Sequence, residues 1–340
     1  LKTHNLIKKG IIIMKKLTYA ISAIAAAFGA ASAQADVSVS GSGSAAYLND
    51  AASATKLNVG QFVSFSMSTT TASGMTISGG MGLSQTITTD HGSGVSGGNT
   101  LSFATGGATI TIGDVEAADT TGAVGGAVGG QVGDNGGFNS DAESGFGDDD
   151  GLGLSLSTAI GGSTLSVVYV GNDNVNTLGE LNSSSSGADA ITSATITVPM
   201  GAYTVTAGVA DSDTGESSSG ASVAAALGGG TLTVGYSTQT LVDGKSDAAH
   251  NGGTASADLS ASGDTTQMGA TYALSLDADT SITVGLQNTK DADNDSTSQF
   301  DASISRALGG GASVFLDIRN LTGDATTKGS AVAVGTSVSF

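Results

Sequence analysis

The feature of this sequence that most constrains its fold is the alternation of apolar residues with small or polar ones. In residues 75–87, Met75, Ile77, Met81 and Leu83 share one parity, while Thr, Ser and Gly fill the other. A period of two with one apolar face is typical of a half-buried antiparallel strand. No long segment repeats its apolar residues at the helical spacing, so the pattern predicts an all-β fold.

The alternation predicts about sixteen strands along the chain. They are expected at 36–48, 56–68, 74–87, 98–104, 108–114, 151–158, 164–171, 189–198, 201–210, 219–227, 230–238, 264–275, 279–287, 296–306, 312–319 and 329–340.

The connections between these strands alternate between short and long. The short ones are expected at 69–73, 105–107, 159–163, 199–200, 228–229, 277–278 and 309–311. The longer, polar or acidic ones are expected at 49–55, 88–97, 115–150, 172–188, 211–218, 239–263, 288–295 and 320–328. Sorting of loop lengths in this way is typical of a transmembrane antiparallel up-and-down β-barrel, with short periplasmic turns and long extracellular loops.

The aromatic residues and the polar parity support the same architecture. Nine of the 13 aromatic residues after Asp36 fall near predicted strand ends, as membrane-interface girdles require. They are Tyr47, Tyr169, Tyr236 and Phe300 at the outer ends, and Phe65, Phe103, Tyr203, Tyr272 and Phe340 at the inner ends. The apolar parity would then face lipid and the Ser, Thr and Gly parity a lumen, which at about sixteen strands is an aqueous channel.

The N-terminal region predicts export. Lys15 and Lys16 precede an apolar run from Leu17 to Ala31, and a small-x-small end follows at 33–35. This is the pattern of a secretory signal peptide over 14–35, cleaved before Asp36. We interpret residues 1–13 as an upstream extension that is not part of the coding sequence, and residues 36–340 as a single barrel domain with a bacterial outer-membrane location.

Charge excludes one class of partner. Five of the 11 basic residues and none of the 30 acidic ones precede Asp36, so the chain from there on has six bases and a net charge of −24. Nucleic-acid binding requires a basic surface, so it is not expected.

Four segments of the sequence resemble the alphaproteobacterial general porins. They are "ADVSVSGSGSAAY" at 35–47, "SFSMSTTTASGMTISGGMGLS" at 64–84, "LGGGASV" at 308–314 and the terminal Phe340. The resemblance implies a homotrimer of 16-stranded barrels in outer-membrane lipid, whose third extracellular loop folds into the lumen. It also implies that the terminal strand, with Val338 and Phe340, is the signal read by the outer-membrane assembly machinery.

The loop that matches the family's constriction loop is 115–150. Its acids, with no Lys or Arg among them, are expected to line the constriction and to favour cations over anions. They are Asp114, Glu116, Asp119, Asp134, Asp141, Glu143, Asp148, Asp149 and Asp150. The family usually opposes such acids with an arginine cluster, which this chain lacks. The candidate bases of the wall or rim are Arg306, near a periplasmic turn, and Arg319 and Lys328, near the outer rim.

The sequence predicts no enzyme and no cofactor. A structural Ca²⁺ is an alternative at two carboxylate clusters, although the second lacks the Gly and Glu of a complete EF-hand loop. The clusters are Asp148, Asp149 and Asp150, and Asp291, Asp293 and Asp295. His91 and His250 lie beside Ser residues, but the abundance of Ser makes a Ser–His hydrolase a weak alternative.

The predicted function is passive diffusion of small hydrophilic solutes and ions through a water-filled pore, with cations preferred. The alternative is a secreted or surface-attached all-β structural protein, such as an adhesin, without a channel.

Overall fold

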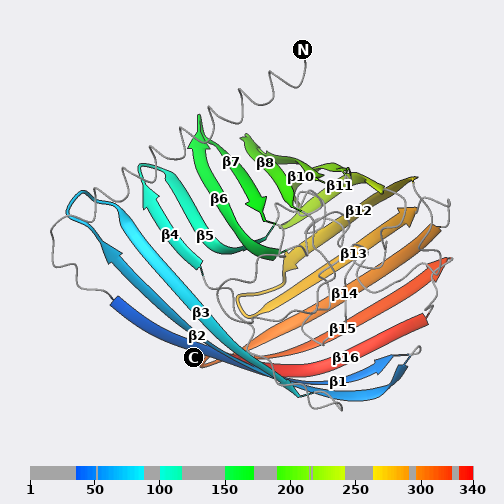
Figure 1. The fold of residues 1–340 in the computed structure, drawn as a ribbon. Coiled ribbons are helices and arrows are strands. Elements are labelled where there is room, and N and C mark those ends of the chain that lie inside the picture. Colours follow the sequence, from blue (N-terminus) through cyan, green and yellow to red (C-terminus); the bar gives the residue numbers. More distant parts are fainter. Residues whose placement is uncertain are drawn as a thin grey trace.

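The computed structural model is a closed barrel of sixteen antiparallel strands, in which each strand pairs with its neighbours in the sequence (Figure 1). It describes residues 36–50, 53–87, 100–116, 150–171, 190–213, 215, 217–241, 263–290, 296–323 and 329–339. No helix in these ranges is long and apolar enough to cross a membrane. The predicted all-β up-and-down barrel is confirmed.

The strand bounds follow the predicted ranges closely. The strands are β1 (Asp36–Asp50), β2 (Ser53–Thr70), β3 (Thr76–Ile87), β4 (Thr100–Thr105), β5 (Ala108–Glu116), β6 (Asp150–Ile160), β7 (Ser163–Val170), β8 (Ile191–Met200), β9 (Tyr203–Ser212), β10 (Ser217–Leu227), β11 (Gly230–Leu241), β12 (Gly263–Ser275), β13 (Thr280–Lys290), β14 (Ser296–Gly309), β15 (Ala312–Gly323) and β16 (Gly329–Ser339).

The barrel closes by pairing its first strand with its last, which lie side by side in Figure 1. The register runs from Ser42 opposite Ser339 to Asp50 opposite Ala331. Among the described residues, 36–41 extend beyond the end of β16 and pair with β2. Closure removes the sheet edge that β1 and β16 would otherwise present along this register.

Glycine pairs make three of the tight turns. Gly106–Gly107, Gly161–Gly162 and Gly228–Gly229 have positive φ at both positions, between 57° and 89°. Two consecutive positive φ angles define the type I′ turn, whose twist matches that of a β-hairpin. The turn predicted at 199–200 lies instead at 201–202, because Pro199 and Met200 are the last residues of β8.

Two of the predicted long connections are short. β1 and β2 extend to leave only residues 51–52 between them, and β9 and β10 leave only 213–216. Where alternating apolar and polar residues continue into a predicted loop, the two strands can keep pairing through backbone hydrogen bonds and become longer than predicted. The contrast between the two barrel ends is therefore smaller at these positions than the sequence predicts.

The two faces of the wall have the predicted polarity. Large apolar side chains on one parity are exposed on the outside, among them Val37, Val39, Leu152 and Leu286. Val332, Val334 and Val338 of β16 share this outward face. The other parity carries Ser, Thr, Gln and Asp residues toward the lumen. A secreted all-β protein would bury its apolar parity, so this polarity disfavours the adhesin alternative.

The lumen wall as candidate functional site

Hydroxyl pairs cover the lumen side of several neighbouring strands. Ser38 and Ser66 place their Oγ atoms 2.6 Å apart across β1 and β2, and Ser40 and Ser64 do so at 2.7 Å. Further pairs join Ser102 to Thr111 at 2.9 Å, Thr197 to Thr206 at 3.2 Å and Ser313 to Ser337 at 2.7 Å. Adjacent antiparallel strands bring these residues close together, because directly opposed positions have their side chains on the same side of the sheet. The result is a polar, uncharged surface.

A row of glutamines crosses the wall from β11 to β14. Gln239, Gln267, Gln287 and Gln299 share the inward parity of their strands. The first two are each 1 % exposed. Gln267 and Gln287 both donate from Nε2 to the Thr289 hydroxyl, at 3.4 and 3.2 Å. These contacts fix the amides against the wall.

The glutamine row ends at a charged cluster on β14 and β15, which we call the Asp–Arg cluster (Asp301, Asp317 and Arg319). Asp301 lies directly opposite Arg319 in the ladder, and Asp317 lies opposite Ser303. Both carboxylates are fully buried, at 0 % exposure. Gln299 donates to Asp301 Oδ2 at 2.7 Å, and Ser303 donates to Asp317 Oδ1 at 2.6 Å.

Burial and pairing decide what the Asp–Arg cluster can do. A buried carboxylate needs an opposite charge or hydrogen-bond donors to offset its desolvation. Asp301 has both Gln299 and the opposing Arg319, yet its Oδ1 has no hydrogen-bond partner in the part of the chain that the structure describes. The net charge of the cluster is −1 when all three groups are ionised. It therefore places fixed charge on an otherwise polar, neutral stretch of wall.

An aromatic side chain fills the wall near the seam where the barrel closes. Phe315 points inward from β15 and is buried, and its ring covers Gly335 of β16. Beyond Gly335 in the ladder lies Ala46 of β1, which is also buried. Small residues on β16 and β1 thus leave the space that the Phe315 ring occupies.

The predicted constriction residues are mostly beyond the described part of the chain. Asp119, Asp134, Asp141, Glu143, Asp148 and Asp149 lie outside the described residues. Asp114 and Glu116 belong to β5, and Asp150 begins β6 opposite Glu116. These three backbone positions share the register of the outward residues Ile112 and Leu152, and their side chains are outside the described set. A role in a constriction stays a prediction for all nine acids.

The predicted bases separate into different places. Arg319 lies on the wall four residues before the outer end of β15, between Asp301 of β14 and Ala331 of β16 in the ladder. Arg306 lies at the inner end of β14, on the outward parity, and donates from Nη1 to Thr280 Oγ1 at 3.2 Å. Lys328, Phe340 and the acids Asp291, Asp293 and Asp295 are outside the described residues. No group of three or more His, Cys, Asp or Glu side chains within the described ranges could hold a metal ion.

The sequence contained a signal for Asp301 and Asp317 that the alternation argument did not use. Both stand on the inward parity of predicted strands, where the other inward residues, apart from Arg319, are uncharged. An ionisable residue inside a membrane-spanning segment is a functional candidate by itself, because its burial is costly. The clustering with Arg319 required the strand register.

Comparisons with known proteins agree with this architecture. The model of the family described as "Gram-negative porin" matches residues 20–326. No curated protein matches the chain. Solved structures with the same fold include a porin refined at 1.8 Å resolution, with 16 % identity and a TM-score of 0.67.

Two further structural neighbours are the anion-selective porin from Comamonas acidovorans, with 13 % identity and a TM-score of 0.63, and a double mutant of the Rh. blastica porin, with 15 % identity and a TM-score of 0.61. Each of the three similarities covers 90 % of this chain and 100 % of the other. A family model that spans most of the residues, joined to a closed barrel with a polar lumen wall, leads to one conclusion. The chain belongs to the Gram-negative porins, the channel proteins of the outer membrane.

Proposed function

We propose that this porin passes small hydrophilic solutes and ions by passive diffusion through a water-filled lumen, and that it prefers cations. The observation that carries the proposal is the polarity of the wall: apolar side chains face outward, and hydroxyl, amide and carboxylate groups face inward. Barrels of this strand number are wide enough to leave an aqueous passage between their walls. Diffusion through such a passage requires no chemical step.

The preference for cations follows from charge. Residues 36–340 carry a net charge of −24, and the charged side chains described on the lumen wall include two carboxylates and one guanidinium. A narrow passage with low-dielectric walls focuses such a field, and salt screens it over about 8–10 Å. The acidic residues of 115–150 would make the potential in the passage more negative if they line it.

The fold alone does not set the sign of the preference, since one structural neighbour is described as anion-selective. The charges of this particular chain therefore carry the argument. We also propose a cleaved signal peptide over 14–35, assembly as a homotrimer, and recognition of the strand ending at Phe340 by the assembly machinery. Structural Ca²⁺ at Asp148–Asp150 or at 291–295 remains part of the proposal.

The test is single-channel recording of the refolded protein in a neutral planar bilayer with a KCl gradient. The expected result is steady conductance with a reversal potential that is closer to the equilibrium potential of K⁺ than to that of Cl⁻. The KCl gradient is then repeated at about tenfold higher concentration on both sides, with the ratio between the sides unchanged. The preference for K⁺ over Cl⁻ should fall, because the Debye length decreases from about 10 Å at 0.1 M to about 3 Å at 1 M. Absence of conductance would contradict the channel, and a preference for Cl⁻ would contradict the charge argument alone.

A further inference from the structure

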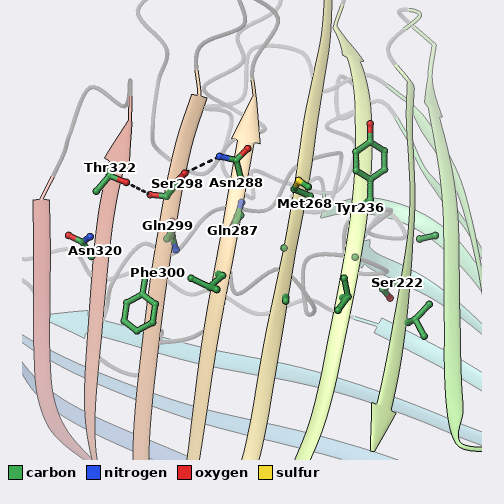
Figure 2. Close-up of a pocket in the computed structure, with 17 residues that line it drawn as sticks. Ser222, Tyr236, Met268, Gln287, Asn288, Ser298, Gln299, Phe300, Asn320 and Thr322 are labelled. Atoms are coloured by element: carbon green, nitrogen blue, oxygen red, sulfur yellow. Dashed lines mark hydrogen bonds between the residues drawn. The ribbon is translucent and has the colours of Figure 1, made fainter. Parts of the chain in front are cut away.

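A groove opens on the outside of the barrel over β10 to β15 (Figure 2). Two neighbouring rows of outward residues form it. The row nearer the outer end contains Tyr236, Met268, Asn288, Ser298 and Thr322, which are cross-strand partners in succession. The next row inward contains Val223, Val234, Ala270, Leu286 and Phe300, related in the same way.

The floor of the groove is low because Ala270 stands between larger neighbours. Val234 and Leu286 lie opposite Ala270 on the two adjacent strands, and both are at least half exposed. The hollow has a volume of about 680 Å³. This is within the range of roughly 300–1,000 Å³ that is usual for small-molecule sites. An apolar chain lying over Ala270 would contact side chains on both sides.

The outer end of the groove is polar. Asn288 donates from Nδ2 to Ser298 Oγ at 2.9 Å and to Ser296 Oγ at 3.2 Å, and Thr322 donates to the Ser298 backbone oxygen at 3.3 Å. Figure 2 shows Asn288, Ser298 and Thr322 together at one end, above Phe300. These groups can exchange hydrogen bonds with the ester or amide linkage of a lipid.

A base lies beyond this polar end. Lys290 follows Asn288 by two residues on β13, so both share the outward face, and Lys290 is exposed. It stands opposite Ser296 and Thr266, which are uncharged. Along the groove, the apolar floor is therefore followed first by hydroxyl and amide groups and then by an ammonium group.

We propose that the groove binds one lipid with an anionic phosphate headgroup. One acyl chain lies over Ala270 between Val234 and Leu286, its linkage meets Asn288 and Ser298, and its phosphate meets Lys290. The groove is continuous with the apolar outer surface that the membrane covers, so a lipid reaches it without leaving the bilayer. The proposal rests on the membrane-spanning barrel of the proposed function.

The test is native mass spectrometry of the full-length mature porin released from detergent, after addition of dimyristoyl phosphatidylglycerol or dimyristoyl phosphatidylcholine. The wild type should retain one phosphatidylglycerol per barrel at lipid concentrations where phosphatidylcholine is lost. Ala270→Phe, which fills the floor, should reduce retention of that lipid at least tenfold. Lys290→Gln should remove the preference for phosphatidylglycerol while leaving binding of either lipid measurable.

The matched control is Ala194→Phe, which makes the same change at an outward position of β8 away from the groove. It should retain phosphatidylglycerol as the wild type does. Equal retention of both lipids by the wild type, or equal loss in both Phe variants, would overturn the proposal. The same preparations are tested for conductance, so that a conducting barrel without a retained lipid refutes the groove alone, and a non-conducting one refutes the channel.

Discussion

At the scale of single residues, Gly335 shows how tightly the closing seam is packed. A Cβ atom at this position would collide with the Phe315 ring and lie 2.5 Å from the Ala45 backbone oxygen. A ring can turn away, but a backbone oxygen in a ladder cannot move without breaking hydrogen bonds. The absence of a side chain at 335 is therefore a requirement of the structure.

We predict that Gly335→Ala destabilises the barrel. Overpacking of a closely packed site costs about 1–3 kcal/mol. The unfolding temperature, followed by heat-dependent migration on SDS gels, should fall for Gly335→Ala. Gly43→Ala is the control, because a Cβ there would make only an ordinary contact of 3.7 Å with Gly60 O. Equal unfolding temperatures for the two variants would contradict the seam argument.

Asp277 gives a second prediction at this scale, in the turn between β12 and β13. Its Oδ1 accepts hydrogen bonds from the backbone N–H groups of Asp279 and Thr280, at 2.9 and 2.7 Å. The bond from Asp279 first, then hydrogen bonding from the side chain and backbone of Thr280, hold the pKa of the Asp277 carboxyl below its ordinary value, with a smaller contribution from the Arg306 charge. A lowered pKa in the folded state means that ionisation stabilises the fold.

That stabilisation is complete above the unfolded-state pKa of about 3.9 and is lost as the pH falls through the lower folded-state pKa. Asp277→Asn should therefore lower the unfolding temperature at pH 7, and the difference from wild type should shrink toward pH 2. Asp279→Asn removes a charge from the same turn but keeps both hydrogen bonds, and serves as control. A difference that is the same at both pH values would refute the assignment to ionisation.

At the scale of elements, the Gly–Gly turns fix the register of their hairpins. Gly161 and Gly162 join β6 to β7 with φ angles of 59° and 88°. A Cβ at Gly162 would meet no heavy atom within 4 Å, so space is not what requires glycine there. Backbone conformation is the whole requirement, because other L residues disfavour positive φ.

We expect Gly162→Ala to destabilise the barrel by about 1 kcal/mol. Gly162→Asn should cost less, since asparagine tolerates the left-handed conformation better than alanine does. Chemical unfolding in detergent, monitored by tyrosine fluorescence, compares the three proteins. If the alanine variant is as stable as the asparagine variant, the type I′ geometry does not limit this hairpin.

At the scale of the whole molecule, the lumen has an uneven distribution of charge. Hydroxyl pairs cover β1 and β2, whereas the Asp–Arg cluster concentrates charge on β14 and β15. An ion in transit therefore passes both neutral and charged stretches of the wall. The cluster should contribute to selectivity even though water does not reach its carboxylates, because an electric field acts across the intervening atoms.

We predict opposite effects from the two signs of charge. Asp301→Asn combined with Asp317→Asn should lower the ratio of cation to anion permeability, and Arg319→Gln should raise it. One unit charge about 8 Å from an ion in water changes its energy by roughly 0.5 kcal/mol, or about twofold in permeability per charge. Reversal potentials under a KCl gradient measure both changes.

Asp264→Asn is the control for these variants. Asp264 lies at the outer end of β12 on the outward parity, where it accepts a hydrogen bond from the Thr240 hydroxyl at 2.8 Å. Its neutralisation removes one charge outside the lumen and should leave the reversal potential nearly unchanged. A shift as large as that of the double variant would mean that net charge, and not the cluster, decides selectivity.

The sequence by itself determined the strand number and the alternation of faces, because both depend on a period of two that is local in the chain. The sorting of loop lengths predicts a barrel, but the pairing of β1 with β16 that closes it belongs to the tertiary structure. The sequence also placed the β14–β15 turn and the Gly–Gly turns, whose conformations need only their own residues. It did not identify Asp301, Asp317 and Arg319 as one cluster, or Phe315 as the partner of Gly335. Those depend on which residues oppose each other across the ladder. Register arises from the pairing of whole strands, and a shift of one residue would move every side chain to the other face. Only the tertiary structure decided it.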